Sequence, residues 1–547
     1  MFKLPYKHLQ LLGLFIIFAC STLQAQITKD TTYFHRSKII SSITTVDGQM
    51  KSVVNYDKKG LVIANYFYKD NKLDGVQKAW YSSGILRSKM LYQDGMLLNK
   101  ETWYQNGIVE YIEEYRLHKV DTNLYTQLHG KYLHNYQNGY SRIKGNYNSA
   151  KKDGKWTEYY ESGIKKSELN YKDGALKGKA TYWYNTGKTK WIQNWIPDTS
   201  TQKNHRRLEL RHGKQLTYNL NGKVFEKSEY RMGKLHGKKT EYHDNGQKKM
   251  EAKYCDDLLC GNFKKWSANG VLLEELNYKV RYDSLRKSNV NVKHGKTLYY
   301  YASGELKLKG NYDEGKLSGV QEEYYSNGQL NSKIYYNNGL LEGTKQVYTA
   351  EGNLLIKESY VLNQDKSGQL KSVLNGLHLR YDVSGLLLDS SNYILGKRDG
   401  LCIFRYKTGQ LASKVFYCEG IPCGEEMQWY EDGKLKLNKF YNDKIGKGIY
   451  ESLSYDSRGN LEVKRRINTY GQIYEQEIYH DNGTVKMREE KLFLPTYSNT
   501  ASYNFHGFCH RYYYYPNGQL LSDELNVNDR TVGRKLKYYV NGRLQSN

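Results

Sequence analysis

Cysteine is the residue type whose spacing in this 547-residue chain first suggests chemistry. Cys255 and Cys260 enclose four residues, and Cys418 and Cys423 enclose four more, each time in the pattern Tyr-Cys-x-x-x-x-Cys-Gly. Both pairs stand at the same point of a repeat described below, so each spans the neck of a hairpin loop. A disulfide bond fits there, and two pairs of free thiols are the alternative. A joint zinc site is excluded, because roughly 65 Å of sheet separates the pairs.

Histidines also recur, directly before a repeat glycine. Equivalent positions in neighbouring hairpins lie about 10 Å apart, so these imidazoles cannot share one ion, and we interpret them as turn residues. Cys402 and Cys509 share another repeat position roughly 40 Å apart and should stay unpaired. The chain has no nucleophile elbow, phosphate-binding loop or His-Glu-x-x-His motif, so we expect no catalytic residues, cofactor or metal. The histidines are His129, His212, His236, His294 and His506.

A glycine repeat defines the elements that must position these residues. Nineteen of the glycines between Gly60 and Gly542 recur at a nearly fixed spacing, each a few residues after an aromatic residue. Eleven of the eighteen intervals between these nineteen glycines are 24 residues. A fixed period between about 20 and 50 residues indicates a repeat array. Tight hairpin turns require positive φ, which glycine adopts readily. The clearest turn glycines are Gly84, Gly163, Gly246, Gly328, Gly409, Gly483 and Gly518.

Side chains between these glycines alternate with period two, as in Leu330, Ser332, Ile334 and Tyr336, which predicts strands. With 55 Tyr, 49 Gly and 14% aromatic residues, a helix-rich enzyme and a disordered chain are both disfavoured. We predict an all-β fold, an elongated single-layer antiparallel β-meander of about nineteen hairpins. Tryptophans that share the position four residues before the turn glycine should be packing aromatics. They are Trp80, Trp103, Trp183, Trp266 and Trp429.

Through Gly385, every third interval is longer, at 32, 35, 34 and 33 residues, and these intervals end at Gly139, Gly222, Gly304 and Gly385; one further interval of 35 residues ends at Gly518. The inserted segments are polar and fall at the same point of the hairpin, so they should line one rim of the sheet. Two interpretations stay open: solvated loops, or a periodic row of loops that contacts a partner.

The N-terminal segment predicts export. Lys3 and Lys7 precede an apolar stretch that is too short to span a bilayer and leads to Ala25, the layout of a secretory signal peptide over residues 1–25. Cys20 offers a lipoprotein site as a less favoured alternative. We expect N-terminal cap strands over residues 26–55 and the repeat array over 56–547. The protein should be periplasmic, outer-membrane-associated or secreted. Its net charge falls from +26 to +24 when the two lysines are removed.

The repeat unit resembles the MORN repeat in its bacterial variant. The matching elements are Tyr-x-x-Gly-x-Leu at residues 301–306 and Tyr-x-x-Gly-x-x-x-Gly at residues 312–319, and the resemblance covers about residues 50–547. It implies hairpins in a single-layer sheet and a role as a scaffold or interaction module. Some relatives are labelled YwqK-type antitoxins, which implies a toxin-binding role that predicted export disfavours.

Three classes of function remain for this sequence. The first is an exported, non-enzymatic scaffold that binds a protein or an envelope polymer. The second is binding of an anionic lipid surface or a glycan through basic and aromatic side chains, and the third is an enzyme, for which no acid pair in a cleft is evident. Nucleic acid is disfavoured by export and by the excess of lysine over arginine. Strands at the ends of the sheet also allow edge-to-edge self-association.

Overall fold

The computed structural model describes residues 27–35, 40–198, 209–441, 449–467, 473–492, 508–527 and 530–545. The predicted signal peptide with Cys20, and also His506, lie outside the described residues. By its internal contacts the chain divides into two units, Met1–Gly237 and Lys238–Asn547. Among the described residues there is no helix of sufficient length and apolar character to cross a membrane.

The first unit consists of β-strands connected mostly by short turns. They are β1 (Thr28–Tyr33), β2 (Ile40–Asp47), β3 (Met50–Tyr56), β4 (Val62–Lys69), β5 (Lys72–Leu73), β6 (Gly75–Trp80), β7 (Leu86–Gln93), β8 (Met96–Trp103), β9 (Val109–Val120), β10 (Asn123–Asn135), β11 (Ser141–Asn148), β12 (Lys151–Tyr159), β13 (Lys165–Lys172), β14 (Ala175–Leu176), β15 (Gly178–Trp183), β16 (Thr189–Pro197), β17 (Glu209–Arg211), β18 (Gly213–Tyr218), β19 (Val224–Arg231) and β20 (Lys234–Leu235).

The second unit continues the same pattern, from β21 onward. Its strands are β21 (Gly237–Tyr242), β22 (Lys248–Cys255), β23 (Leu258–Trp266), β24 (Leu272–Asp283), β25 (Ser288–Lys293), β26 (Gly295–Tyr300), β27 (Leu306–Asp313), β28 (Lys316–Leu317), β29 (Gly319–Tyr324), β30 (Leu330–Asn337), β31 (Leu340–Tyr348), β32 (Leu354–Gln364), β33 (Leu370–Leu374), β34 (Gly376–Tyr381), β35 (Leu387–Ile394), β36 (Lys397–Arg398), β37 (Gly400–Arg405), β38 (Leu411–Cys418), β39 (Ile421–Trp429), β40 (Leu435–Tyr441), β41 (Ile449–Tyr455), β42 (Leu461–Ile467), β43 (Ile473–Tyr479), β44 (Val485–Leu492), β45 (Phe508–Tyr514), β46 (Leu520–Val527), β47 (Arg530–Thr531) and β48 (Leu536–Lys537).

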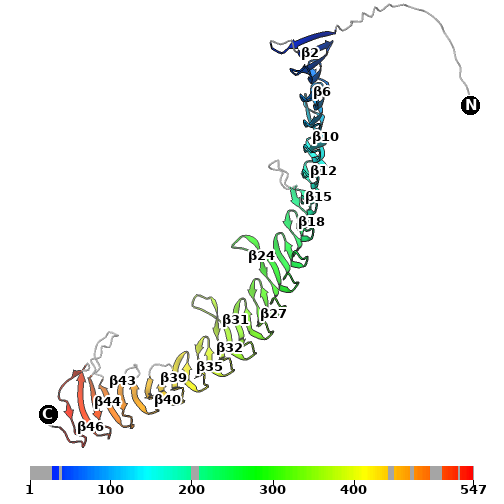
Figure 1. Cartoon of the computed structure of the whole chain (residues 1–547). Coiled ribbons are helices and arrows are strands. Elements are labelled where there is room, and N and C mark those ends of the chain that lie inside the picture. The colour runs from blue at the N-terminus through cyan, green and yellow to red at the C-terminus, as the bar shows by residue number, and fades with distance from the viewer. Residues whose placement is uncertain are drawn as a thin grey trace, which may run out of the picture. The chain divides into compact units, whose positions relative to one another are not determined.

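The predicted antiparallel meander is confirmed. The described residues form 48 strands of one open sheet, and no helix occurs among them. Successive strands pair antiparallel along the chain, for example β29 with β30 and β30 with β31. Figure 1 shows the strands of each unit following one another in chain order. Among the residues with a described position, no second sheet packs over this one, so few of their apolar side chains are fully buried.

Each repeat uses one turn of three residues and a glycine. At the turn after β29, the Gly328 amide donates to the Tyr325 carbonyl and the Tyr325 amide donates to the Gln329 carbonyl, at 3.0 and 2.9 Å. Gly328 has φ of 83°, and the register shifts between Glu323 and Tyr324. This is a type I turn closed by a glycine bulge, which explains the glycine of the 24-residue period.

In repeats such as the one that contains β27 and β29, the second connection is a two-residue turn. Asp313 pairs with Lys316, and the central residues Glu314 and Gly315 both have positive φ, at 46° and 87°. Gly319 then opens the next strand, again with positive φ, at 77°. In the Tyr-x-x-Gly-x-x-x-Gly pattern, the first glycine therefore belongs to a type I′ turn and the second to a bulge that follows it.

The two faces of the sheet differ in side-chain content. In β12 and β13, Gly154 pairs with Tyr171 and Trp156 pairs with Leu169, whereas Lys155 pairs with Asn170 between them. Adjacent residues of a strand point to opposite faces. We call the face with Tyr171 and Trp156, together with the equivalent positions of other repeats, the tyrosine face, and the opposite face the lysine face.

Candidate functional site

Tyrosines at the first position of the glycine turn link successive repeats. The hydroxyl of Tyr325 donates to the carbonyl of Tyr348 at 2.9 Å, and Tyr301 donates to Tyr324 at 2.7 Å. Each bond joins one turn to the last strand residue before the next turn. The Tyr of Tyr-x-x-Gly therefore connects neighbouring hairpins. The tyrosines that do this are Tyr81, Tyr104, Tyr136, Tyr160, Tyr184, Tyr301, Tyr325, Tyr406, Tyr430 and Tyr515.

Repeats without this tyrosine satisfy the turn in another way. His243 and His480 place Nε2 3.0 and 3.1 Å from the equivalent carbonyl. Asp382 instead accepts hydrogen bonds from the amides of Ser384 and Leu386 within its own turn, at 2.8 and 2.9 Å. These contacts assign the turn positions a structural role, because a turn requires its donors to be satisfied.

Both predicted cysteine pairs are bonded in the structure. Cys255 bonds to Cys260 and Cys418 bonds to Cys423, with Cα–Cα separations of 5.7 and 5.8 Å. Each bond spans a two-residue turn, at β22–β23 and at β38–β39. Cys402 is a buried free cysteine. Each disulfide bond therefore joins the two strands that its turn connects and braces that turn.

The predicted packing tryptophans end strands. Each of the five is the last residue of its strand, immediately before a glycine turn, and each is partly exposed. Sequence reasoning missed Trp156, which lies within β12 and is 2% exposed. Its indole covers Gly145 of β11, where an added Cβ would lie 2.3 Å from Cδ2. The absence of a side chain at residue 145 was the signal in the sequence. The predicted tryptophans lie at the ends of β6, β8, β15, β23 and β39.

A row of ionic side chains lies on the tyrosine face of the second unit. Glu358 accepts hydrogen bonds from Lys345 at 2.8 Å and from Tyr360 at 2.9 Å. The ring of His378 stands between the carboxylates of Glu358 and Asp389, at 3.3 and 3.7 Å. Burial alone would raise the pKa of Glu358, but the bonds from Lys345 and Tyr360 hold that pKa below its ordinary value. The groups are largely buried, so we assign them to packing of the sheet.

The lysine face changes character along the sequence. The residue after the strand-opening glycine is lysine in several repeats, where it pairs with Asn or Glu across the strand. In β37 that position holds Leu401, which pairs with Phe416, and these two side chains are 42% and 45% exposed. Leu377 and Phe440 are exposed at equivalent positions of adjoining repeats. We call these four residues the apolar patch. The lysines are Lys131, Lys155, Lys179 and Lys214 in the first unit, and Lys296 is an example in the second unit.

A shallow hollow in the first unit carries part of that lysine row. Lys131, Lys144 and Lys155 line it together with Asn146 and Thr157. Lys155 also pairs with Glu168 at 3.2 Å, so part of its charge is already compensated. The hollow offers cations and amides to an anion, and it holds no acid–base pair.

The described parts of the longer intervals pair as the strands of hairpin arms. The arms extend from the repeat strands as β9 with β10, β16 with β17, β24 with β25 and β32 with β33. In the second unit both arms project from the same edge of the sheet (Figure 1). Their strand pairing continues the antiparallel register outward. At the tip of one arm, Leu285 is 94% exposed.

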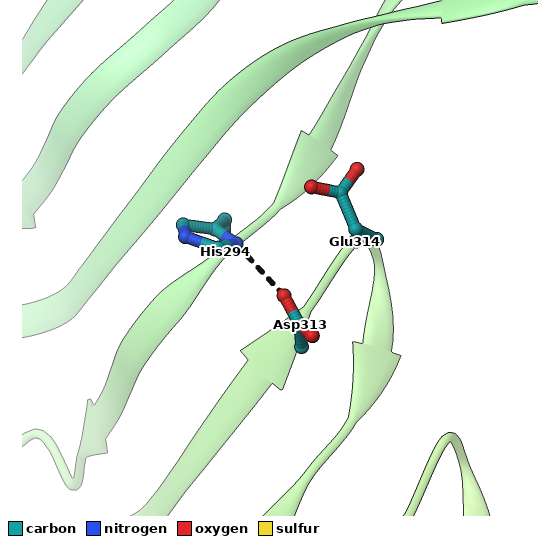
Figure 2. A group of neighbouring side chains, drawn as sticks. All are labelled: His294, Asp313 and Glu314. Carbon is teal, nitrogen blue, oxygen red and sulfur yellow. Dashed lines mark ion pairs between the residues drawn. The ribbon is translucent and has the colours of Figure 1, made fainter.

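One group of side chains at the base of an arm has the composition of a metal site. His294 lies between β25 and β26, Asp313 ends β27 and Glu314 begins the following turn. Gly295 pairs with Tyr312 across these antiparallel strands. His294, directly before Gly295, therefore lies beside Asp313 and Glu314, which directly follow Tyr312. Their ligand atoms all lie within 4.8 Å of one another. Figure 2 shows the three side chains, with the ion pair from the His294 ring to Asp313.

Basic side chains border this group. Lys279, in the arm strand β24, donates to Glu314 at 2.6 Å. That hydrogen bond holds the pKa of the Glu314 carboxyl below its ordinary value. The sequence prediction compared histidines only with one another, and it missed that one of them meets carboxylates of its own repeat. The signal was the Asp-Glu-Gly triplet at residues 313–315.

Catalytic machinery is not evident in the part of the chain that the structure describes. Glu322–Glu323 and Glu425–Glu426 are adjacent in sequence but point to opposite faces of their strands. Buried serine and cysteine side chains such as Ser391 and Cys402 are 0% exposed, so they are not accessible to a substrate.

Two comparisons with known proteins give no information on the function of the chain. No curated protein matches the chain. A solved structure entitled "Crystal Structure of TcdB2-TccC3-TEV" aligns with 94% of this chain at 10% identity and a TM-score of 0.12. The chain covers 33% of that protein, and so low a TM-score supports no argument about fold or function.

The model of the MORN repeat variant matches nine segments of the chain. A typical match, residues 317–338, begins after one type I′ turn and ends in the next, so one match is one hairpin. The matched residues are 73–94, 152–173, 211–232, 235–256, 259–279, 293–314, 317–338, 398–419 and 422–443. These nine matches and the hairpins that they coincide with identify the chain as a protein of the MORN repeat-variant family.

Proposed function

We propose that this protein is an exported, non-enzymatic repeat scaffold that binds a protein partner of the cell envelope. The observation that carries the proposal is the apolar patch of the second unit, at Leu377, Leu401, Phe416 and Phe440. These side chains are exposed within strands, where the same position in other repeats holds lysine. The centre of the patch is the Leu401–Phe416 pair, and Leu377 and Phe440, which pair with Asn392 and Glu425, lie in strands to either side of it. Exposed apolar patches mark interaction sites in soluble proteins, and aromatic residues are enriched at protein interfaces.

The framework around the patch supports a binding role. Backbone pairing on both sides of each strand, the tyrosine links and the Cys418–Cys423 disulfide hold the strands in a fixed register. A partner that docks on such a surface meets side chains whose order is already established, which lowers the entropic cost of binding.

A paired substitution tests the proposal. Leu401→Lys with Phe416→Asn reproduces the Lys155–Asn170 pair that another repeat uses at the same position, so the strands should retain their register. The control is Leu285→Ser, which removes an exposed side chain from an arm tip. Affinity capture from envelope fractions, followed by binding of the purified partner, should show loss with the paired variant alone. An unchanged affinity of the purified partner would refute the proposal.

A second function is favoured by the lysine row of the first unit. Lys131, Lys155, Lys179 and Lys214 share one face and one repeat position, which suits an anionic lipid surface or a glycan. The Debye length falls from about 10 Å at 0.1 M salt to about 3 Å at 1 M, so such binding should disappear with added salt. Co-sedimentation with phosphatidylglycerol vesicles measures it, and binding that resists salt would exclude this mechanism.

Export itself is a separate proposal with its own test. N-terminal sequencing of the protein from a host envelope fraction should find Gln26 as the first residue. A cytoplasmic, unprocessed chain would instead favour the antitoxin-like role that YwqK-type relatives suggest. A chain that starts at a lipid-modified Cys20 would identify a lipoprotein.

A further inference from the structure

We infer that His294, Asp313 and Glu314 form a binding site for a divalent transition-metal ion, with Zn²⁺ as the best fit. The inference concerns a site at the root of the arm β24–β25 and does not rest on the proposed scaffold function. An imidazole nitrogen combined with two carboxylates is a donor set that zinc accepts, whereas Mg²⁺ and Ca²⁺ prefer all-oxygen sites.

The geometry of the first two donors fits tetrahedral zinc. Ligands about 2.1 Å from Zn²⁺ lie about 3.4 Å apart in a tetrahedral arrangement, and Nδ1 of His294 lies 3.3 Å from Oδ1 of Asp313. The Glu314 carboxylate lies within 4.8 Å of both and can approach by side-chain rotation. Three protein ligands leave a fourth position for water.

The His294 nitrogen is an independent indication of a ligand. Nδ1 is shielded from solvent, and no hydrogen-bond partner is described for it. Asp313 is close enough for an ion pair but not aligned for a hydrogen bond. A shielded ring nitrogen without a hydrogen bond is costly, and coordination of a cation would satisfy it.

Other repeats show that the combination is not a general feature of the fold. His212 occupies the position of His294 in its own repeat, directly before a strand-opening glycine. There Gly213 pairs with Tyr230, and the next two residues are Arg231 and Met232 instead of Asp313 and Glu314. His212 is therefore a matched control with the same backbone and no carboxylates.

Lys279 sets the affinity of the site. Its ammonium group donates to Glu314 at 2.6 Å, so a metal ion must compete with it for the carboxylate. Metal binding would then hold the β27–β28 turn to the base of the arm in place of this ion pair. Removal of Lys279 should strengthen binding, whereas removal of a ligand should weaken it.

Isothermal titration of the purified full chain with ZnCl₂ tests the inference. The wild type should bind one equivalent of Zn²⁺ that His294→Ala and Asp313→Asn either lose or bind at least about tenfold more weakly. Even changes outside the ligand set reduce metal affinity on this scale. Lys279→Met should tighten it several-fold. His212→Ala should behave as the wild type, and MgCl₂ should produce no equivalent at this site.

Hydrogen exchange locates the bound ion without relying on stoichiometry. The amide of Gly315 donates to the Lys293 carbonyl and the amide of His294 donates to the Asn277 carbonyl, both at 2.9 Å. Zn²⁺ should slow exchange in peptides that cover these amides, and the matched amides of Gly233 and His212 should not change. Equal zinc binding and equal protection in wild type and His294→Ala would overturn the inference.

Discussion

The most specific packing prediction concerns Gly145, which lies under the indole of Trp156. A Cβ at residue 145 would lie 2.3, 2.5 and 2.7 Å from three indole carbons. Ordinary contact begins at 3.4 Å, so Gly145→Ala requires the ring to move by about 1 Å, the difference between 3.4 and 2.3. Overpacking of a filled site costs about 1–3 kcal/mol.

The surroundings of Trp156 leave little room for that movement. Tyr147 and Tyr132 hold its ring at centroid distances of 4.9 and 5.5 Å. The indole Nε1 donates to the Asn146 carbonyl at 3.0 Å. A displaced ring would lose this bond together with the edge contact to Tyr147, so the upper part of the range is expected.

Hydrogen exchange is the suitable assay, because repeat arrays open locally and a single global midpoint is not well defined. A cost of about 2–3 kcal/mol should accelerate exchange of Gly145→Ala in peptides from β11 to β13 by about 25- to 140-fold, since 1.4 kcal/mol is a factor of ten. The matched control is Gly310→Ala at the same repeat position, where the new Cβ would meet Gln321 Cγ at an ordinary 3.7 Å. That variant should be neutral or slightly protected.

A double-mutant cycle identifies the cause of the change. If the cost comes from the indole, Gly145→Ala should be nearly neutral in a Trp156→Ala background. Equal effects of Gly145→Ala and Gly310→Ala, or a full cost of Gly145→Ala without the indole, would refute the packing argument.

Three further outcomes are expected. Tyr325→Phe removes a hydrogen bond between repeats and should destabilise them by about 1 kcal/mol, seen as faster exchange in β29–β31, whereas Tyr282→Phe on the exposed arm should change nothing. Cys418→Ser with Cys423→Ser should destabilise the β38–β39 turn by about 2 kcal/mol through loop entropy, and alkylation of the wild type without reductant should label neither cysteine. The folded-state pKa of Glu358 is depressed, so its stabilisation is present above the unfolded-state pKa and lost as pH falls through the folded value. Hydrogen exchange in β31–β34 should accelerate below about pH 4, and Glu358→Gln should reduce this pH dependence. If the variant accelerates at low pH as much as the wild type does, the pH dependence comes from other groups.

The sequence determined what a single hairpin requires. Turn glycines such as Gly328 are readable because positive φ is a local demand that few residues meet. The alternation from Leu330 to Tyr336 is equally local, and its repetition every 24 residues predicted the antiparallel meander. The Cys255–Cys260 spacing was interpretable for the same reason, since both cysteines flank one turn.

The tertiary structure decided which residues meet across strands. Register placed Leu401 opposite Phe416 and exposed both, and it set Trp156 over Gly145, whereas the tryptophans at strand ends stayed partly exposed. It also brought His294 beside Asp313 and Glu314 through the β26–β27 pairing. A repeat period gives the position of a side chain within its own hairpin, but contact between strands depends on bulges and turns that shift the register by single residues.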